Sequence, residues 1–166
     1  MRVNNIKCSV ITNCSILEEK LLNHEKYKTC LGKATLIIYA HSPLLINLTG
    51  LQSMKEVETT RKYIEVVYNV KCSELRVDNI FYSHKDYLSI DLYKLYYYLR
   101  EHYQDKFVID YNVELFPGLY MKSKIKGFPT LILFRTGSYT IIGSKSIEMV
   151  KKYKKFIHKL YEIYIW

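Results

Sequence analysis

The residues best suited to specific chemistry lie between Leu115 and Ile147. Five basic side chains occur there without an acidic one: Lys122, Lys124, Lys126, Arg135 and Lys145. Large apolar side chains alternate with them. Basic side chains attract the phosphates of nucleic acids, and apolar side chains can press on the bases between those phosphates. This combination predicts contact with a polyanion that has an apolar interior.

Catalytic and metal-binding chemistry has no comparable signal. The five histidines are scattered, and none has a Cys, Asp or Ser at the spacing of a triad or a metal site. The four cysteines lack CxxC spacing, which is typical of free thiols in a reducing compartment. Neither a glycine-rich phosphate loop nor a pair of carboxylates is present. We therefore expect a binding protein that is not an enzyme and needs no cofactor.

The elements that must position the basic and apolar residues are strands joined by a tight turn. The apolar run 131–134 leads into Arg135-Thr136-Gly137-Ser138, where Gly137 supplies the positive φ of a hairpin, and 139–142 returns until Gly143 ends the strand. Further strands are predicted at 3–12, 27–31, 34–39, 44–49, 75–83, 107–109 and 119–121, and helices at 15–22, 53–68, 89–103 and 146–164. Helical spacing predicts a buried stripe on the second helix: Met54, Val57, Thr60, Ile64 and Val67.

The order strand, helix, hairpins, helix occurs twice, with a period of about 75 residues. Val3-Asn4-Asn5-Ile6 corresponds to Val77-Asp78-Asn79-Ile80, and 36–39 with Thr49-Gly50 corresponds to 132–134 with Ile142-Gly143. The duplication predicts a pseudo-twofold sheet with helices on one face and the other face open. The first repeat is assigned to residues 1–73 and the second to 74–166.

The second repeat resembles the TATA-binding protein family. The family carries a near-identical ELFPGL segment, a LIF-x-SGK turn and a TGAK ending, where this chain has ELFPGL at 114–119, LILF-x-TG at 131–137 and GSK at 143–145. The resemblance implies an α+β fold: a duplicated saddle whose curved antiparallel sheet carries helices on its convex face, with a shortened first repeat.

In this family the concave sheet lies on the minor groove of DNA, and pairs of phenylalanines wedge between base steps to kink the duplex. By resemblance, Phe116 and Phe134 form the wedge pair of the second repeat, and two asparagines can donate to groove acceptors. The implied DNA-contacting residues are Asn5, Lys7, Tyr39, Thr49, Asn79, Phe81, Phe116, Lys122, Phe134, Thr140, Ile142 and Lys145. Core packing is the alternative for the two phenylalanines, and a polar surface position is the alternative for the asparagines.

The first repeat departs from the family pattern. It is shorter between its first helix and Leu36, which is expected to remove most of two strands together with the first wedge phenylalanine. Tyr39 stands at the second wedge position, Lys7 and Phe81 stand where small apolar residues are usual, and Ile142 replaces a threonine. We therefore expect one well-matched half and one degraded half.

The net charge of +9 favours anionic partners. The resemblance implies a transcription initiation factor that binds and bends AT-rich promoter DNA through the minor groove and recruits RNA polymerase and other initiation factors. It would act in the nucleus or at a viral transcription site. On the closing helix, Lys151, Lys152 and Lys155 are the implied partner-binding residues, with a solvated helix face as the alternative.

Two other functions stay open. The first is an interaction subunit of a transcription complex that keeps the fold but depends on an obligate protein subunit for DNA binding. The second is a nuclease accessory domain that grips a hybrid duplex, a hypothesis that rests on the fold alone. No apolar run approaches about 18 residues, so no membrane partner is expected.

Overall fold

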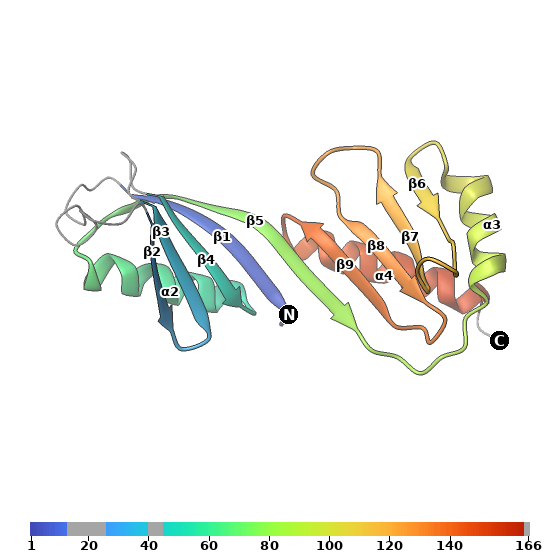
Figure 1. Cartoon of the computed structure of the whole chain (residues 1–166), viewed down its shortest axis with the longest axis horizontal. Helices are drawn as coiled ribbons and strands as arrows, with labels where there is room; N and C mark the ends of the chain where they lie inside the picture. Colours follow the sequence, from blue (N-terminus) through green and yellow to red (C-terminus); the bar gives the residue numbers. More distant parts are fainter. Residues whose placement is uncertain (13–25, 40–44, 165–166) are drawn as a thin grey trace. The chain divides into compact units, whose positions relative to one another are not determined.

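The computed structural model describes residues 1–12, 26–39 and 45–164 (Figure 1). The chain forms two compact units, Met1–Asn79 and Ile80–Trp166. The helix predicted at 15–22 lies outside the described residues. The units divide near the middle of a long strand, whereas the repeat boundary assigned from the sequence, between 73 and 74, lies close to the start of that strand. That boundary stays a prediction.

The sheet of the first unit consists of β1 (Asn5–Thr12), β2 (Lys26–Leu31), β3 (Ala34–Tyr39), β4 (Leu45–Leu51) and the first half of β5 (Cys72–His84). The order of the strands is β2-β3-β4-β1-β5, and β1 to β4 pair antiparallel. Helix α2 (Met54–Val67) packs against β1 and β4. This unit therefore has one covered sheet face.

The sheet of the second unit consists of the second half of β5 and of β6 (Phe107–Asp110), β7 (Gly118–Ser123), β8 (Thr130–Phe134) and β9 (Tyr139–Ser144). The order is β5-β9-β8-β7-β6. Its helices are α3 (Leu92–Tyr103) and α4 (Ile147–Tyr164). Figure 1 shows α4 running across one face of these strands and α3 beside β6. None of the helices in the described part of the chain is long and apolar enough to span a membrane.

Strict alternation along the strands of the second unit separates a core face from an open face. The alternate residues that face the helices are fully buried: Leu119, Met121, Leu131, Leu133, Tyr139 and Ile141. Their neighbours on β8 and β9 are half-buried: Thr130, Ile132, Phe134, Thr140 and Ile142. Because successive side chains of a strand point to opposite faces, the second set lies together on the face away from the helices.

Two helix details differ from the sequence predictions. Helix α3 begins after Asp91, whose carboxylate accepts from the Lys94 amide at 3.1 Å, and not after Ser89. A carboxylate at this position also interacts favourably with the positive end of the helix dipole. On α2, Met54 and Val67 are 39% and 51% exposed rather than buried. A stripe that repeats every three or four residues drifts around a helix, so its two ends leave the sheet.

Both units contain the same backbone irregularity. In the first, Ile6 pairs with Leu51 and Cys8 with Leu48, so the two residues Thr49-Gly50 lie opposite Lys7. In the second, the pairing is Ile80 with Ser144 and Tyr82 with Ile141, so Ile142-Gly143 lies opposite Phe81. The φ angles of Gly50 and Gly143 are 86° and 85°, which glycine adopts readily. Gly143 therefore makes a bulge within β9 and does not end the strand.

The shortened repeat loses less than expected. Strand β2 has six residues and pairs with β3 along its whole length, across a turn at Gly32 and Lys33. The expectation that most of two strands are removed is therefore wrong for β2. Strand β6 of the second unit has no counterpart among the described residues of the first unit.

Candidate nucleic-acid interface

Phe116 and Phe134 lie together on the open face of the second unit. Their ring centroids are 6.0 Å apart and the rings are inclined by 64°, an edge-to-face contact. Phe116 is 45% exposed and Phe134 is half-buried, so core packing does not account for either ring. Two aromatic residues that are 18 positions apart in the sequence thus form one exposed apolar surface.

Gly118 makes the room for these rings. It lies directly opposite Phe134 in the pairing of β7 with β8. A Cβ atom on Gly118 would lie 2.6 Å from the ring of Phe116, 2.7 Å from a methyl of Ile132 and 3.1 Å from the ring of Phe134. The glycine of the ELFPGL segment is therefore needed for close packing.

Backbone hydrogen bonds fix the segments that carry the two rings. The Phe116 amide donates to the Asn112 carbonyl at 2.9 Å, which holds the end of the loop before β7. The Phe134 amide donates to the Ser138 carbonyl at 2.9 Å, and the Gly137 amide donates to the Phe134 carbonyl at 2.9 Å. With a φ of 77° at Gly137, this is the tight hairpin that the sequence predicts.

The rest of the open face around the ring pair is largely apolar. Phe81, Thr140 and Ile142, which were predicted as contact residues, lie on this face and are half-buried. Sequence analysis missed Ile132, which pairs with Thr140 and lies two residues before Phe134. Its position could have been found from the period-2 alternation that assigns Phe134 to this face.

Basic residues border the same face. Lys122 is exposed and lies opposite Thr130 on β8. Lys145 is exposed just after β9, and so are Lys124 and Lys126 in the loop after β7. The face is not free of acidic groups, because the exposed Asp110 on β6 lies opposite Tyr120. The acid-free stretch of the sequence, 115–147, does not include β6, which precedes it.

In the first unit, Asn5 and Thr49 contact each other at the bulge. The Gly50 amide donates to Asn5 Oδ1 at 2.8 Å, which fixes the orientation of the side-chain amide. Asn5 Nδ2 then lies 3.2 Å from Thr49 Oγ1. Because the Nδ2 group carries two hydrogens, it can bind Thr49 and a further acceptor at once. Asn79 is at the equivalent place on β5 and is half-buried.

The other predicted residues of the first unit are less apolar than their equivalents. Lys7 is exposed opposite the bulge, and Tyr39 is half-buried at the end of β3. Beneath this face Cys8 is fully buried, and burial together with the nearby Asp78 carboxylate raises the pKa of its thiol to about 11. The structure thus places Lys7 and Tyr39 on the open side of the first unit.

The predicted partner-binding lysines lie on α4, on the covered side of the second unit. Lys151, Lys152 and Lys155 are exposed. Lys154 differs from them, because its ammonium group lies 4.8 Å from the centroid of the Tyr82 ring, within the range of a cation–π contact. Lys154 therefore contributes to packing, whereas the other three present their charge to solvent.

Comparison with known proteins gives one consistent answer. Residues 74–163 match the model of the family described as transcription factor TFIID, or TATA-binding protein (TBP). The chain belongs to the TBP family. Members of this family are transcription factors and not enzymes, and their partners are DNA and the transcription machinery.

A solved structure shows the same fold. The structure is similar to that of Methanococcus jannaschii TBP, with a TM-score of 0.68 and 21% identity over 96% of this chain and 97% of that chain. This likeness confirms the predicted α+β saddle fold. Comparison with curated proteins gives no match.

Proposed function

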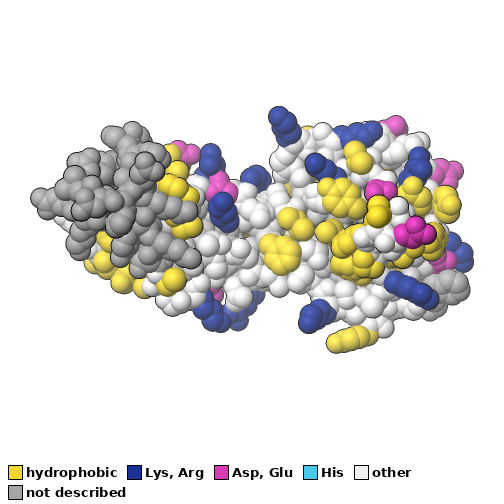
Figure 2. All heavy atoms as spheres, in the orientation of Figure 1, with side chains coloured by type: hydrophobic (Ala, Val, Ile, Leu, Met, Phe, Trp, Pro, Cys, Tyr) yellow, Lys and Arg dark blue, Asp and Glu magenta, His cyan; other side chains and the backbone are white. Residues whose placement is uncertain are grey.

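We propose that this TBP-family chain binds AT-rich double-stranded DNA through the minor groove, bends it, and recruits RNA polymerase and other initiation factors. The observation that carries the proposal is the pair Phe116 and Phe134, which is exposed on an apolar sheet face and bordered by lysines. Figure 2 shows hydrophobic side chains gathered over the half of the molecule that carries β6 to β9, with Lys and Arg side chains around them.

Each group of residues has a physical role in this proposal. The two rings enter between base steps, where unstacking costs a few kcal/mol that added contact in the bent duplex offsets. Ile132, Thr140 and Ile142 contact sugars and base edges. The lysines neutralise phosphates: Lys122, Lys124, Lys126 and Lys145. Asn5 and Asn79 donate to purine N3 and thymine O2, and preference for AT-rich DNA follows from its deformability.

Fluorescence energy transfer between the two ends of a labelled duplex with a central TA step tests the wedge. Binding of the wild-type protein should raise the transfer, and a G·C-rich duplex should abolish the rise. Phe116→Ala and Phe134→Ala should each lower affinity about tenfold, because base–aromatic stacking contributes roughly 1–3 kcal/mol per base.

The matched control is Phe128→Ala. Phe128 is 46% exposed, close to the 45% of Phe116, and it lies in the loop after β7 and outside the ring pair. This control should bend DNA as the wild type does, with circular dichroism confirming the fold of all variants. Equal bending by the Phe116→Ala, Phe134→Ala and control proteins would contradict the wedge.

An interaction subunit without autonomous DNA binding is the second candidate. Lys7 favours it, because a charged side chain opposite the bulge of the first unit replaces the apolar contact that Phe81 offers in the second. In that case Lys151, Lys152 and Lys155 would carry the main function by binding acidic proteins of the transcription complex. A folded protein with no duplex affinity that binds a subunit of RNA polymerase would support this candidate over the first.

A further inference from the structure

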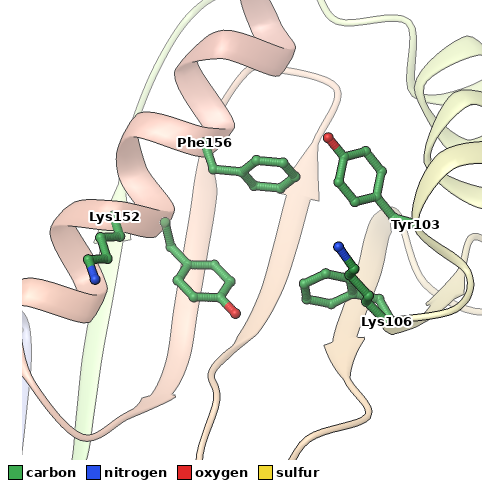
Figure 3. A pocket seen from close by; sticks show the side chains of 6 residues that line it. Tyr103, Lys106, Lys152 and Phe156 are labelled. Atoms are coloured by element: carbon green, nitrogen blue, oxygen red, sulfur yellow. The ribbon is translucent and has the colours of Figure 1, made fainter.

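A hollow of about 270 Å³ lies in the second unit on the side opposite the proposed DNA face. It is formed where the end of α3, the start of β6 and the first half of α4 meet (Figure 3). Six residues line it: Tyr103, Lys106, Phe107, Lys152, Tyr153 and Phe156. Its two parts, residues 103–107 and 152–156, are far apart in the sequence, so no local motif indicates it.

The walls of the hollow are aromatic. The ring of Tyr103 packs edge-to-face on Phe156 at 5.5 Å and on Phe107 at 6.4 Å. All four aromatic side chains are half-buried. This partial burial raises the pKa of the Tyr103 and Tyr153 hydroxyls. The hollow is therefore an apolar surface that would gain free energy from being filled.

The rim of the hollow is cationic. Lys106 and Lys152 are exposed on opposite sides, with their side chains drawn in Figure 3. Lys155 lies three residues after Lys152 on α4 and is exposed as well. The exposed Asp105 beside Lys106 offsets part of this charge. Aromatic boxes can bind cations, but this rim repels them.

The hollow is small. Its volume of about 270 Å³ lies near the lower end of the roughly 300–1,000 Å³ of drug-sized ligand sites. One large side chain that fills a desolvated pocket at the centre of an interface is the usual anchor of a protein contact. Duplex DNA offers phosphates to the rim but keeps its bases stacked, so it leaves the hollow empty.

We infer that this hollow takes one aromatic or large aliphatic side chain from an acidic segment of a partner protein. The inference deepens the partner-binding role proposed for the α4 lysines and rests on it. The rim attracts and orients the acidic residues, and the aromatic walls bind the anchor. Lys151, which does not line the hollow, contributes to attraction alone.

Binding of labelled peptides to the full chain tests the inference. The probes are acidic peptides of Asp, Glu and Gly with one central Phe, Trp or Leu, and a matched peptide with Ser at the centre. Fluorescence anisotropy should show that the best anchor binds about tenfold more tightly than Ser, which is the usual scale for filling an interface pocket. Ring resonances of Tyr103 and Phe156 should shift on binding of the anchored peptides.

Protein variants separate the hollow from general charge. Lys152→Glu should weaken the anchored peptide about tenfold, whereas Lys159→Glu, the same charge change at an exposed position on the same helix outside the lining, should weaken it far less. Phe156→Ser should abolish the preference for the anchor. If Phe156→Ser fails to fold, the comparison of Lys152→Glu with Lys159→Glu still tests the inference. Both lysines are exposed, so neither substitution disturbs the core.

Several outcomes would overturn the inference. They are absence of binding by every anchored peptide, equal affinity for the Phe and Ser peptides, and equal effects of the two charge changes. In a further contrary outcome, a G·C-rich duplex at equal charge concentration displaces the peptide without shifting the ring resonances of Tyr103 and Phe156. That result would assign the lysines to binding of flanking DNA instead. Bending of the TA duplex is measured without peptide, so failure of the DNA proposal is seen separately from failure at the hollow.

Discussion

The two units share a backbone frame on their open faces but differ in the side chains that it presents. The bulge at Thr49-Gly50 opposite Lys7 has its equivalent at Ile142-Gly143 opposite Phe81. In the first unit half-buried polar side chains at this place form hydrogen bonds, with Asn5 bound to both Thr49 and Gly50. In the second unit Asn79 keeps the place of Asn5, but Ile142 stands in place of Thr49 and Phe81 in place of Lys7. The same geometry thus presents polar side chains at these two positions in one half and apolar side chains in the other.

The strand ends show the same difference. Phe134 lies opposite Gly118, which leaves the space that the second ring occupies. Tyr39, at the equivalent end of β3, lies opposite Lys26, so the first unit has no glycine at that register position. A glycine with a positive φ is needed for a bulge or turn whatever side chains surround it, whereas Gly118 is needed because a Cβ atom there would meet the two rings and Ile132. The difference between the two open faces at these positions therefore lies in the side chains that they present.

The largest expected effect comes from filling the space at Gly118. Gly118→Ala should destabilise the protein by about 1–3 kcal/mol, the usual cost of overpacking, because its Cβ atom would meet both phenylalanine rings and Ile132. It should also abolish bending of the TA duplex by moving the rings apart. Urea denaturation and the energy-transfer assay measure the two effects.

A double-mutant cycle makes this prediction specific to the ring pair. In a Phe116→Ala background, Gly118→Ala should cost less than in the wild type, because the nearest contact at 2.6 Å is removed. Additive costs would show that the glycine is needed for the backbone and not for the rings. In that case the presence of Gly118 opposite Phe134, and of Lys26 opposite Tyr39, would not explain why the ring pair forms in the second unit.

The second prediction exchanges the aromatic residues of the two halves. Phe134→Tyr should weaken DNA binding about fivefold, because the added tyrosine hydroxyl would lose its hydrogen bonds to water when the ring enters between stacked bases. A buried hydroxyl without a hydrogen-bond partner costs roughly 1–3 kcal/mol. Tyr39→Phe should change affinity less than about twofold, because Tyr39 lies opposite Lys26 and not opposite a glycine, so this strand end does not leave the space that Gly118 leaves beside Phe134. Titration of the labelled duplex measures both. A larger effect at Tyr39 than at Phe134 would reverse the assignment of the wedge to the second unit.

The third prediction separates a structural role of Asn5 from a role as a hydrogen-bond donor to DNA. Asn5→Asp keeps an oxygen for the Gly50 amide but replaces the Nδ2 donor, so the free energy of unfolding should change by less than about 0.5 kcal/mol while DNA affinity falls. Asn5→Ala should lose both, with a stability loss of about 1 kcal/mol. Asn79→Asp is the matched variant in the other half. If Asn5→Asp binds DNA as tightly as the wild type, Asn5 has a structural role alone.

Local signals were the ones that could be predicted from the sequence. The hairpin at Gly137 and the cap at Ser53, whose hydroxyl accepts from the Glu56 amide at 3.2 Å, depend on residues within a few positions. Family resemblance, and not residue pattern, indicated that Phe116 and Phe134 belong together. Alternation alone places Phe134 on a face but says nothing of a residue that precedes β7.

The errors have physical causes too. Ser89 and Asp91 are both capping residues two positions apart, and the sequence does not show that the Ile90 amide donates to the Arg135 carbonyl and leaves Asp91 to begin the helix. The extent of the shortening was overestimated in the comparison with the family pattern, although the sequence itself predicts a strand at 27–31, which is β2. The hollow beside Tyr103 and Phe156 was missed because it exists where distant elements pack together.

The last prediction concerns the core beneath the two bulges. Cys8 occupies in the first unit the place that Tyr82 has in the second, by the register that follows each bulge. Its pKa is raised to about 11 in the folded protein and is about 8.5–9 for a solvated thiol. The neutral thiol therefore adds stability that is fully present below pH about 9 and is lost as the pH rises through about 11.

The unfolding free energy should thus fall by about 1 kcal/mol more in the wild type than in Cys8→Val between pH 8 and pH 10. Valine keeps the site apolar and does not titrate, so the difference between the two pH dependences isolates the thiol. Tyr139 and Tyr161 also have a raised pKa through burial, but they contribute equally to both proteins. Parallel pH dependences would mean that Cys8 reaches water in solution, and that the core of the first unit is looser than its buried strands indicate.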